Sequence, residues 1–259
     1  MPKYKNNQIT EMLCQIRFAT VLKINNESDE SLSEFQEKIK EEFPIYQMIN
    51  ENVLNVEMSG GEKNIESITP QILRNNIKNH MFISNSGNEK INLTCNFISL
   101  SINQYESWEN FKEKFIWILD IFNQVYKIEK FNRIGIRYIN AFSKAELGIN
   151  EQDKWDQYIS EDIVGLSSKY NVNVYNSNIE IPFDNNSQMR IISGLGTKQN
   201  KDNSVEPVFI IDKDTYKLGN IEKINIDETL ERLHGHNSEI FESLIKQNLR
   251  DKMGVIEND

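Results

Sequence analysis

Cysteine, proline, glycine and histidine are all scarce in this sequence. Its 259 residues include 2 cysteines, 5 prolines, 11 glycines and 3 histidines. Two cysteines cannot form the dense disulfide framework of a small secreted domain, and so little proline and glycine excludes collagen-like and low-complexity chains. No stretch reaches the ~18 consecutive apolar residues of a membrane-spanning helix, and the first residues lack the apolar segment of a secretory signal. We therefore expect a globular, cytoplasmic protein that does not cross a membrane.

Both cysteines lie in apolar, strand-like runs. Cys14 is within residues 12–18, and Cys95 is within residues 91–100. Free thiols in such runs usually serve as small core residues, which fits a reducing cytoplasm. Neither cysteine has a histidine nearby in the sequence, so a cysteine nucleophile has no support.

Acidic residues outnumber basic ones. The 39 Asp and Glu residues against 29 Lys and Arg give a formal net charge of −10. A surface that follows nucleic-acid phosphates needs the opposite sign, because such binding is driven by the release of counterions. Acids and bases also alternate along the chain, which is typical of a solvated surface. Non-specific nucleic-acid binding is therefore disfavoured.

The N-terminal half, residues 1–145, combines strand and helix patterns. Alternation over residues 9–24 predicts a strand with one buried face. Ser31 and Glu34 form a capping box for a short helix. The remaining predicted elements are strands at residues 53–58, 81–84, 91–100 and 131–142, a turn at residues 59–61, and a long helix at residues 108–126 capped near Asn103.

The C-terminal half, residues 146–259, follows a polar stretch at residues 143–161 that we interpret as a boundary or long connection. Its predicted elements are strands at residues 171–175, 179–183, 188–192 and 208–211, and turns at residues 184–186 and 193–196. An apolar helical stripe follows at residues 226–249. We expect this helix to kink or split at Gly235 or residues 237–238 and to stop near Gly254. Strands in series followed by a helix favour an antiparallel sheet. We therefore predict an α+β fold in two similar halves, each an antiparallel sheet packed on one long helix. The halves are either separate domains or one continuous globule, and duplication and coincidence both explain their likeness.

Three segments resemble the sequence motifs of a known family. They are Arg-Ile-Gly-Ile-Arg-Tyr-Ile-Asn at residues 133–140, Ile-Asp-Lys-Asp-Thr-Tyr at residues 211–216, and Leu233-His234 followed by Phe-Glu-Ser-Leu-Ile at residues 241–245. With the early Phe43-Pro44 in the same order, the chain resembles a sporadically distributed family of uncharacterised bacterial proteins. The resemblance implies no activity. It implies the patchy occurrence that is typical of mobile genes, such as defence or toxin-control modules.

Two arginines share one face of the strand predicted at residues 131–142. Arg133 and Arg137 flank Gly135, which has no side chain. Guanidinium groups bind phosphates and carboxylates bidentately, and a glycine lets a ligand come close. The sequence therefore offers Arg133, Gly135 and Arg137 as an anion site. The alternative is that both arginines pair with acidic residues of neighbouring strands.

Asp212 and Asp214 follow the apolar run at residues 208–211. Carboxylates on one side of an extended segment could ligate Mg²⁺ and orient a phosphate. The simpler interpretation is a strand end and turn, because Asp side chains satisfy local backbone donors. His234 is either a general base or a core histidine held by a hydrogen bond, and His236 points to another face of the helix.

The remaining conspicuous residues carry little signal. His80 is isolated in a polar loop and indicates no function. Trp155 is surrounded by acids and amides, where a Trp is a candidate anchor for a partner. Gly194 and Gly196 resemble half of a phosphate loop, yet no helix start follows, so a flexible hairpin is the better interpretation.

No nucleophile elbow, Walker A motif or Cys-x-x-Cys pattern occurs, so we assign no catalytic residue and expect no cofactor. The sequence favours a non-catalytic protein-binding regulator or accessory subunit, acting with a protein partner or as a homo-oligomer such as a homodimer, in a bacterial defence or toxin-control module. The alternative is a small-anion or nucleotide-binding protein, or a metal-dependent enzyme, built on Arg133, Arg137, Asp212 and Asp214.

Overall fold

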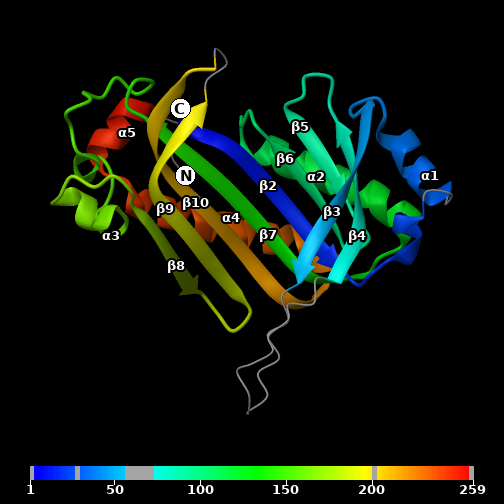
Figure 1. The fold of residues 1–259 in the computed structure, drawn as a ribbon. Helices are drawn as coiled ribbons and strands as arrows, with labels where there is room; N and C mark the ends of the chain where they lie inside the picture. The colour runs from blue at the N-terminus through cyan, green and yellow to red at the C-terminus, as the bar shows by residue number, and fades with distance from the viewer. Residues whose placement is uncertain (1–2, 27–29, 56–72, 200–202, 257–259) are drawn as a thin grey trace, which may run out of the picture.

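One antiparallel sheet of nine strands organises the molecule. The computed structural model describes residues 3–26, 30–55, 73–199 and 203–256. The strands of the sheet are β2 (Ile9–Phe18), β3 (Ile45–Asn55), β4 (Leu73–Ile83), β5 (Glu89–Leu93), β6 (Phe97–Ile102), β7 (Lys130–Ser143), β8 (Asn176–Pro182), β9 (Ser187–Gln199) and β10 (Val205–Glu222). They lie in the order β3-β4-β5-β6-β2-β7-β10-β9-β8, and every neighbouring pair is antiparallel (Figure 1). The predicted α+β class is confirmed.

The two long helices pack on one face of this sheet. The helices are α1 (Glu30–Ile39), α2 (Trp108–Tyr126), α3 (Glu161–Val164), α4 (Ile226–Leu244) and α5 (Gln247–Met253), with 3₁₀ turns at Leu22–Asn25, Trp155–Gln157, Gly165–Ser168 and Lys223–Asn225. In Figure 1, α4 lies behind β7 and β10, and α2 lies behind β5 and β6. The strands β1 (Lys3–Tyr4) and β11 (Val255–Ile256) form a separate two-stranded sheet. No helix among these described segments is long and apolar enough to cross a membrane.

The apolar patterns of the N-terminal half correspond to real elements. Met12, Cys14 and Ile16 of β2 are fully buried, as the alternation predicts. Helix α2 spans the predicted residues, but its N-cap is Ser107, whose side chain accepts a hydrogen bond from the Asn110 backbone, and the prediction of a cap near Asn103 is wrong. Cys14 and Cys95 are both free and buried.

The run at residues 91–100 is two strands and not one. Between β5 and β6 the chain turns at residues 94–96, where Thr94 Oγ1 accepts hydrogen bonds from the backbone N–H groups of Asn96 and Phe97. Since the threonine hydroxyl satisfies these donors, the turn needs no glycine or proline signal. Of the predicted strand at residues 53–58, only the part up to Asn55 lies within the described residues, and the predicted turn at residues 59–61 lies outside them.

The C-terminal half has longer strands than its turn signals predict. β9 runs straight through Gly194 and Gly196, so the predicted turn and flexible hairpin at residues 193–196 are wrong. Residues 171–175 do not form a strand. A Cβ atom at Gly194 would clash with the Tyr175 carbonyl oxygen, so this glycine lets the chain before β8 approach the sheet.

The C-terminal helical stripe breaks later than expected. α4 continues through Gly235 and Asn237 and ends at Leu244. A short extended segment separates it from α5, because Ile245 bridges to Ile159 and the Lys246 backbone N–H donates to the Tyr158 carbonyl. The predicted split at residues 235–238 is therefore wrong, whereas the end at Gly254, with a positive φ of 70°, is as predicted.

The described residues form two apolar clusters, and α4 joins them. Leu230 and Leu233, on its first turns, belong to the cluster under α1 and α2, while Leu244 belongs to the cluster beside α5. β7 pairs with β2 on one side and β10 on the other, so the sheet is continuous across residue 145. The internal likeness of the two halves stays a prediction.

Candidate functional site

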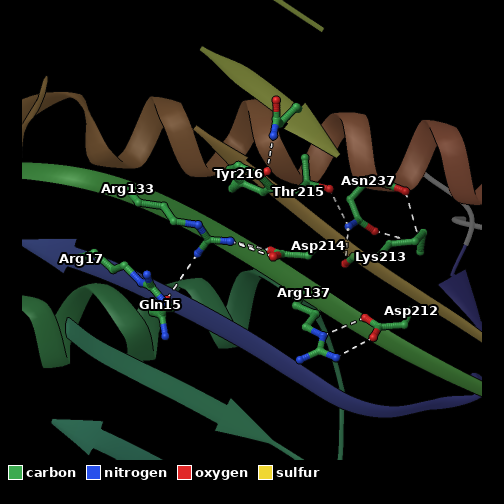
Figure 2. A network of polar contacts seen from close by, with 11 residues as sticks. Gln15, Arg17, Arg133, Arg137, Asp212, Lys213, Asp214, Thr215, Tyr216 and Asn237 are labelled. Carbon is green, nitrogen blue, oxygen red and sulfur yellow. Dashed lines mark hydrogen bonds and ion pairs between the residues drawn. The ribbon is translucent and has the colours of Figure 1, made fainter. Parts of the chain in front are cut away.

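Polar side chains gather on both faces of β7 and β10. Alternation along β10 places Asp212 and Asp214 on the face that α2 and α4 leave open, and Lys213 between them on the face toward α4 (Figure 2). The residues that the sequence predicts as anion and metal ligands lie on the open face. A cavity lies on the opposite face of the sheet, beside Lys213.

The predicted anion ligands are paired with the predicted metal ligands. Arg137 donates from Nε and Nη2 to the two carboxylate oxygens of Asp212 at 2.8 and 2.6 Å. Arg133 donates from Nη2 to both oxygens of Asp214 at 3.0 and 2.8 Å. Both pairs are diagonal, because the register sets Asp214 opposite Arg137. Each guanidinium therefore neutralises a carboxylate, as the alternative interpretation of the arginines expects.

Arg133 fills the space above Gly135. A Cβ atom at Gly135 would lie 2.6 Å from Arg133 Nη1, and the guanidinium also stacks 4.5 Å from the centre of the Tyr216 ring. The glycine thus makes room for an arginine of its own strand. Asp212 and Asp214 lie inside β10, so their interpretation as a strand end and turn is wrong. Among the described residues, no group of three or more His, Cys, Asp or Glu side chains is arranged to hold a metal ion.

Lys213 is buried on the opposite face, with 2% of its surface exposed. Its Nζ donates to Asn237 Oδ1 at 2.8 Å and to the Asn237 backbone carbonyl at 3.3 Å, and it lies 4.2 Å from the centre of the Phe241 ring. Asn237 Nδ2 in turn donates to Thr215 Oγ1 at 2.9 Å. Burial lowers the pKa of Lys213 to about 7, against the smaller opposite effect of the Glu242 carboxylate.

A cavity of about 350 Å³ lies beside this lysine, and we call it the Lys213 cavity. Ile9 of β2, Tyr138 and Asn140 of β7 and Lys213 line it from the sheet. The other lining residues come from α4, from the start of α2 and from the β1 and β11 strands; they include Tyr4, Trp108, His234, Asn237, Ser238, Phe241 and Ile256. The cavity therefore lies where the two apolar clusters meet.

One polar atom of the cavity wall is unsatisfied. Asn140 is 3% exposed, and its Oδ1 is buried with no hydrogen-bond partner among the described residues. A buried acceptor without a donor costs about 1–3 kcal/mol. A ligand with an N–H or O–H group would remove this cost.

His234 lies in the same cavity and is held as a neutral ring. Burial lowers its pKa to about 4, so the ring is neutral near pH 7, and its Nδ1 shares a hydrogen bond of 3.0 Å with the Tyr138 hydroxyl. The ring stacks on Trp108 at 4.3 Å. This is the hydrogen-bonded core histidine of the sequence analysis. The ring of His236 instead stacks on Phe183, at 4.1 Å.

The remaining predicted residues lie elsewhere. His80 is part of β4 and not of a loop; it is fully buried, with one ring nitrogen 2.9 Å from the Ile24 carbonyl. Trp155 packs 5.8 Å from Phe209, which joins it to the core beside α5. Because His234 and the Arg and Asp pairs lie on opposite faces of the sheet, they do not meet in one cleft.

Sequence reasoning missed Lys213, Asn140 and Asn237. A signal for Lys213 exists, because two-residue alternation from the apolar Ile211 places it on the buried face. No family model, curated protein or solved structure matches the chain.

Proposed function

We propose that this protein binds a small organic molecule in the Lys213 cavity. One observation carries the proposal: the cavity joins a buried amine and an unsatisfied buried acceptor, Asn140 Oδ1, within aromatic walls. Its volume of about 350 Å³ lies at the lower end of the range for ligand pockets, ~300–1,000 Å³. A few convergent polar groups in an apolar pocket are the usual features of a ligand site.

The wall favours a ligand without net negative charge. Four carboxylates line the cavity, on Glu106, Glu109, Glu231 and Glu242, against the two lysines Lys3 and Lys213. The ligand would present a polar group to Lys213, a hydrogen-bond donor to Asn140, and an apolar part to the rings of Trp108 and Phe241. This differs from the anion or nucleotide site that the sequence offers on the open face.

Thermal melts with a panel of neutral, cationic and anionic compounds test the proposal. A compound that binds only the folded chain at 100 times its Kd adds about 2.7 kcal/mol to the free energy of unfolding. Ser238→Trp fills the cavity, whereas Ser243→Trp places the same ring on the exposed side of α4. We expect neutral or cationic compounds to stabilise the wild type and Ser243→Trp but not Ser238→Trp. Equal stabilisation of both variants, or of none of the three proteins, contradicts the proposal.

Protein binding is a second candidate, and the edge of the sheet favours it. β3 ends the strand order, and Ile45, Met48 and Ile49 are 41%, 37% and 46% exposed. An apolar edge strand is a template for strand addition by a partner or a second copy. We propose this edge as the contact of a regulator or accessory subunit in a bacterial defence or toxin-control module.

The oligomeric state tests the second candidate. We expect light scattering to show a homodimer, or a stoichiometric complex with a co-purified host protein, that Ile49→Lys disrupts. Leu166→Lys changes an apolar residue, 65% exposed, in the 3₁₀ turn that follows α3 beside β9, and should leave the assembly intact. A wild-type chain that stays a monomer without a partner contradicts this candidate.

A further inference from the structure

We propose that Lys213 is a nucleophilic amine that captures an aldehyde or ketone ligand as an imine in the Lys213 cavity. This inference rests on the proposed function and names its ligand class.

The hydrogen bonds of Lys213 leave its lone pair free. A neutral amine has two N–H groups and one lone pair. Both N–H groups are used by Asn237, one by Oδ1 at 2.8 Å and one by the backbone carbonyl at 3.3 Å. Because Lys213 lines the cavity, the lone pair is the remaining group that a ligand can meet.

No close carboxylate holds Lys213 in its charged form. The titratable groups that face it are Glu242 and His234 of α4, Tyr138 of β7 and Tyr4 of β1. Glu242 accepts hydrogen bonds from Tyr4 at 2.9 Å and from Arg250 at 3.1 Å, and Lys213 forms no salt bridge with any described residue. With the pKa of Lys213 lowered to about 7, about half of the amine is neutral at pH 7. An ordinary lysine, with a pKa of about 10.4, is neutral about 10³-fold less often.

The step balances without an oxidant or reductant. The lone pair of Nζ attacks the carbonyl carbon, a C–N bond forms, and the carbonyl π pair moves to the oxygen, which gains a proton while the nitrogen loses one. The carbinolamine then breaks its C–O bond, the hydroxyl leaves as water with a second proton, and the nitrogen gives up its other hydrogen. Amine and carbonyl thus give imine and water. Asn140 Oδ1 would accept a hydrogen bond from a hydroxyl or amide on the same ligand.

Reductive trapping tests the imine. The wild-type chain is incubated at pH 7 with benzaldehyde, which is uncharged, and sodium cyanoborohydride, and the adducts are located by peptide mass spectrometry. We expect one benzyl group per chain on Lys213, formed about 10³-fold faster than adducts on exposed lysines. Lys213→Met should lose the fast adduct, whereas Lys217→Met, on the same strand, should keep it.

The outcomes separate the two proposals. A trapping rate at Lys213 equal to that of exposed lysines overturns the imine, even where Lys213→Met fails to fold, since the wild type alone gives this result. Stabilisation by panel compounds that Ser238→Trp abolishes, without a fast adduct, rejects the imine and keeps the proposed function. A fast adduct that Ser238→Trp leaves unchanged contradicts a reaction inside the cavity, and so rejects the inference.

Discussion

Asn237 of α4 accepts hydrogen bonds from Lys213 of β10 through two oxygens, its side-chain Oδ1 and its backbone carbonyl. Its Nδ2 also donates to the Lys213 carbonyl at 3.4 Å, so the two residues are joined in both directions. The partners of the lysine are neutral. Because a buried ammonium without a close counter-charge is costly, the burial of Lys213 favours the neutral amine.

The stability of the protein should depend on this amine at alkaline pH. The folded-state pKa of Lys213 is about 7 and the ordinary value is 10.5, so between these values the unfolded chain binds more protons. The free energy of unfolding should therefore rise as the pH increases from about 7 to 10.5, by at most about 1.4 kcal/mol per pH unit. Urea unfolding of wild type and Lys213→Met should diverge over this range. Parallel curves would contradict the shifted pKa.

His234 should give a second pH dependence, in acid. Its pKa is lowered from 6.5 to about 4 by burial, so the unfolded chain again binds more protons between these values. The free energy of unfolding should fall as the pH drops from about 6.5 to 4, by on the order of 2 kcal/mol. His234→Phe keeps a ring against Trp108 and should lose this part of the acid sensitivity. If the free energy of unfolding of His234→Phe falls below pH 6.5 as steeply as that of the wild type, a neutral His234 is contradicted.

Two glycine substitutions should have opposite effects. Gly135→Ala displaces the flexible end of the Arg133 side chain from Tyr216 and Asp214, which should cost about 1 kcal/mol. Gly235→Ala adds a methyl group inside α4 where nothing lies within 4 Å, which should stabilise the chain by about 0.5–1 kcal/mol. Thermal melts compare the two directly. An unchanged melting temperature of Gly135→Ala would mean that Arg133 does not need this space.

Arg137→Ala should destabilise the protein and should not change its stabilisation by ligands. It leaves the Asp212 carboxylate, 11% exposed, without its ion-pair partner, but the 44% exposure of the Arg137 side chain limits the loss. We expect about 1–3 kcal/mol, below the ~3–5 kcal/mol of a fully buried pair. Inorganic phosphate and ATP should stabilise neither the wild type nor the variant. A rise in the melting temperature with phosphate in the wild type but not in Arg137→Ala would support the anion site on the open face.

One-sided burial made part of the fold predictable. The 3.6-residue stripe of α2 and the alternation of β2 and β7 reflect burial against the same core, so local sequence is enough to find them. β10 was predicted as too short because Asp212 and Asp214 read as a strand end. Their compensating arginines lie 75 and 81 residues away in the sequence, where no local pattern shows them.

The site was harder to predict than the fold. Asp212 and Asp214 stand out in the sequence because carboxylates are common metal ligands, whereas Lys213 between them matches no motif. The burial of Lys213 depends on α4 covering it, and its partner Asn237 is 24 residues away. The unsatisfied Asn140 Oδ1 is a property of the assembled cavity alone.

The pKa of Lys213, measured in the folded chain, tests the account most directly. Side-chain NMR of the ¹⁵N-labelled protein follows each lysine Nζ through a pH titration, and Lys213→Met assigns the signal. The account predicts a midpoint of about 7 for Lys213. A midpoint near the ordinary lysine value of about 10.4 would show a charged, solvated amine and would contradict the proposed reactive site.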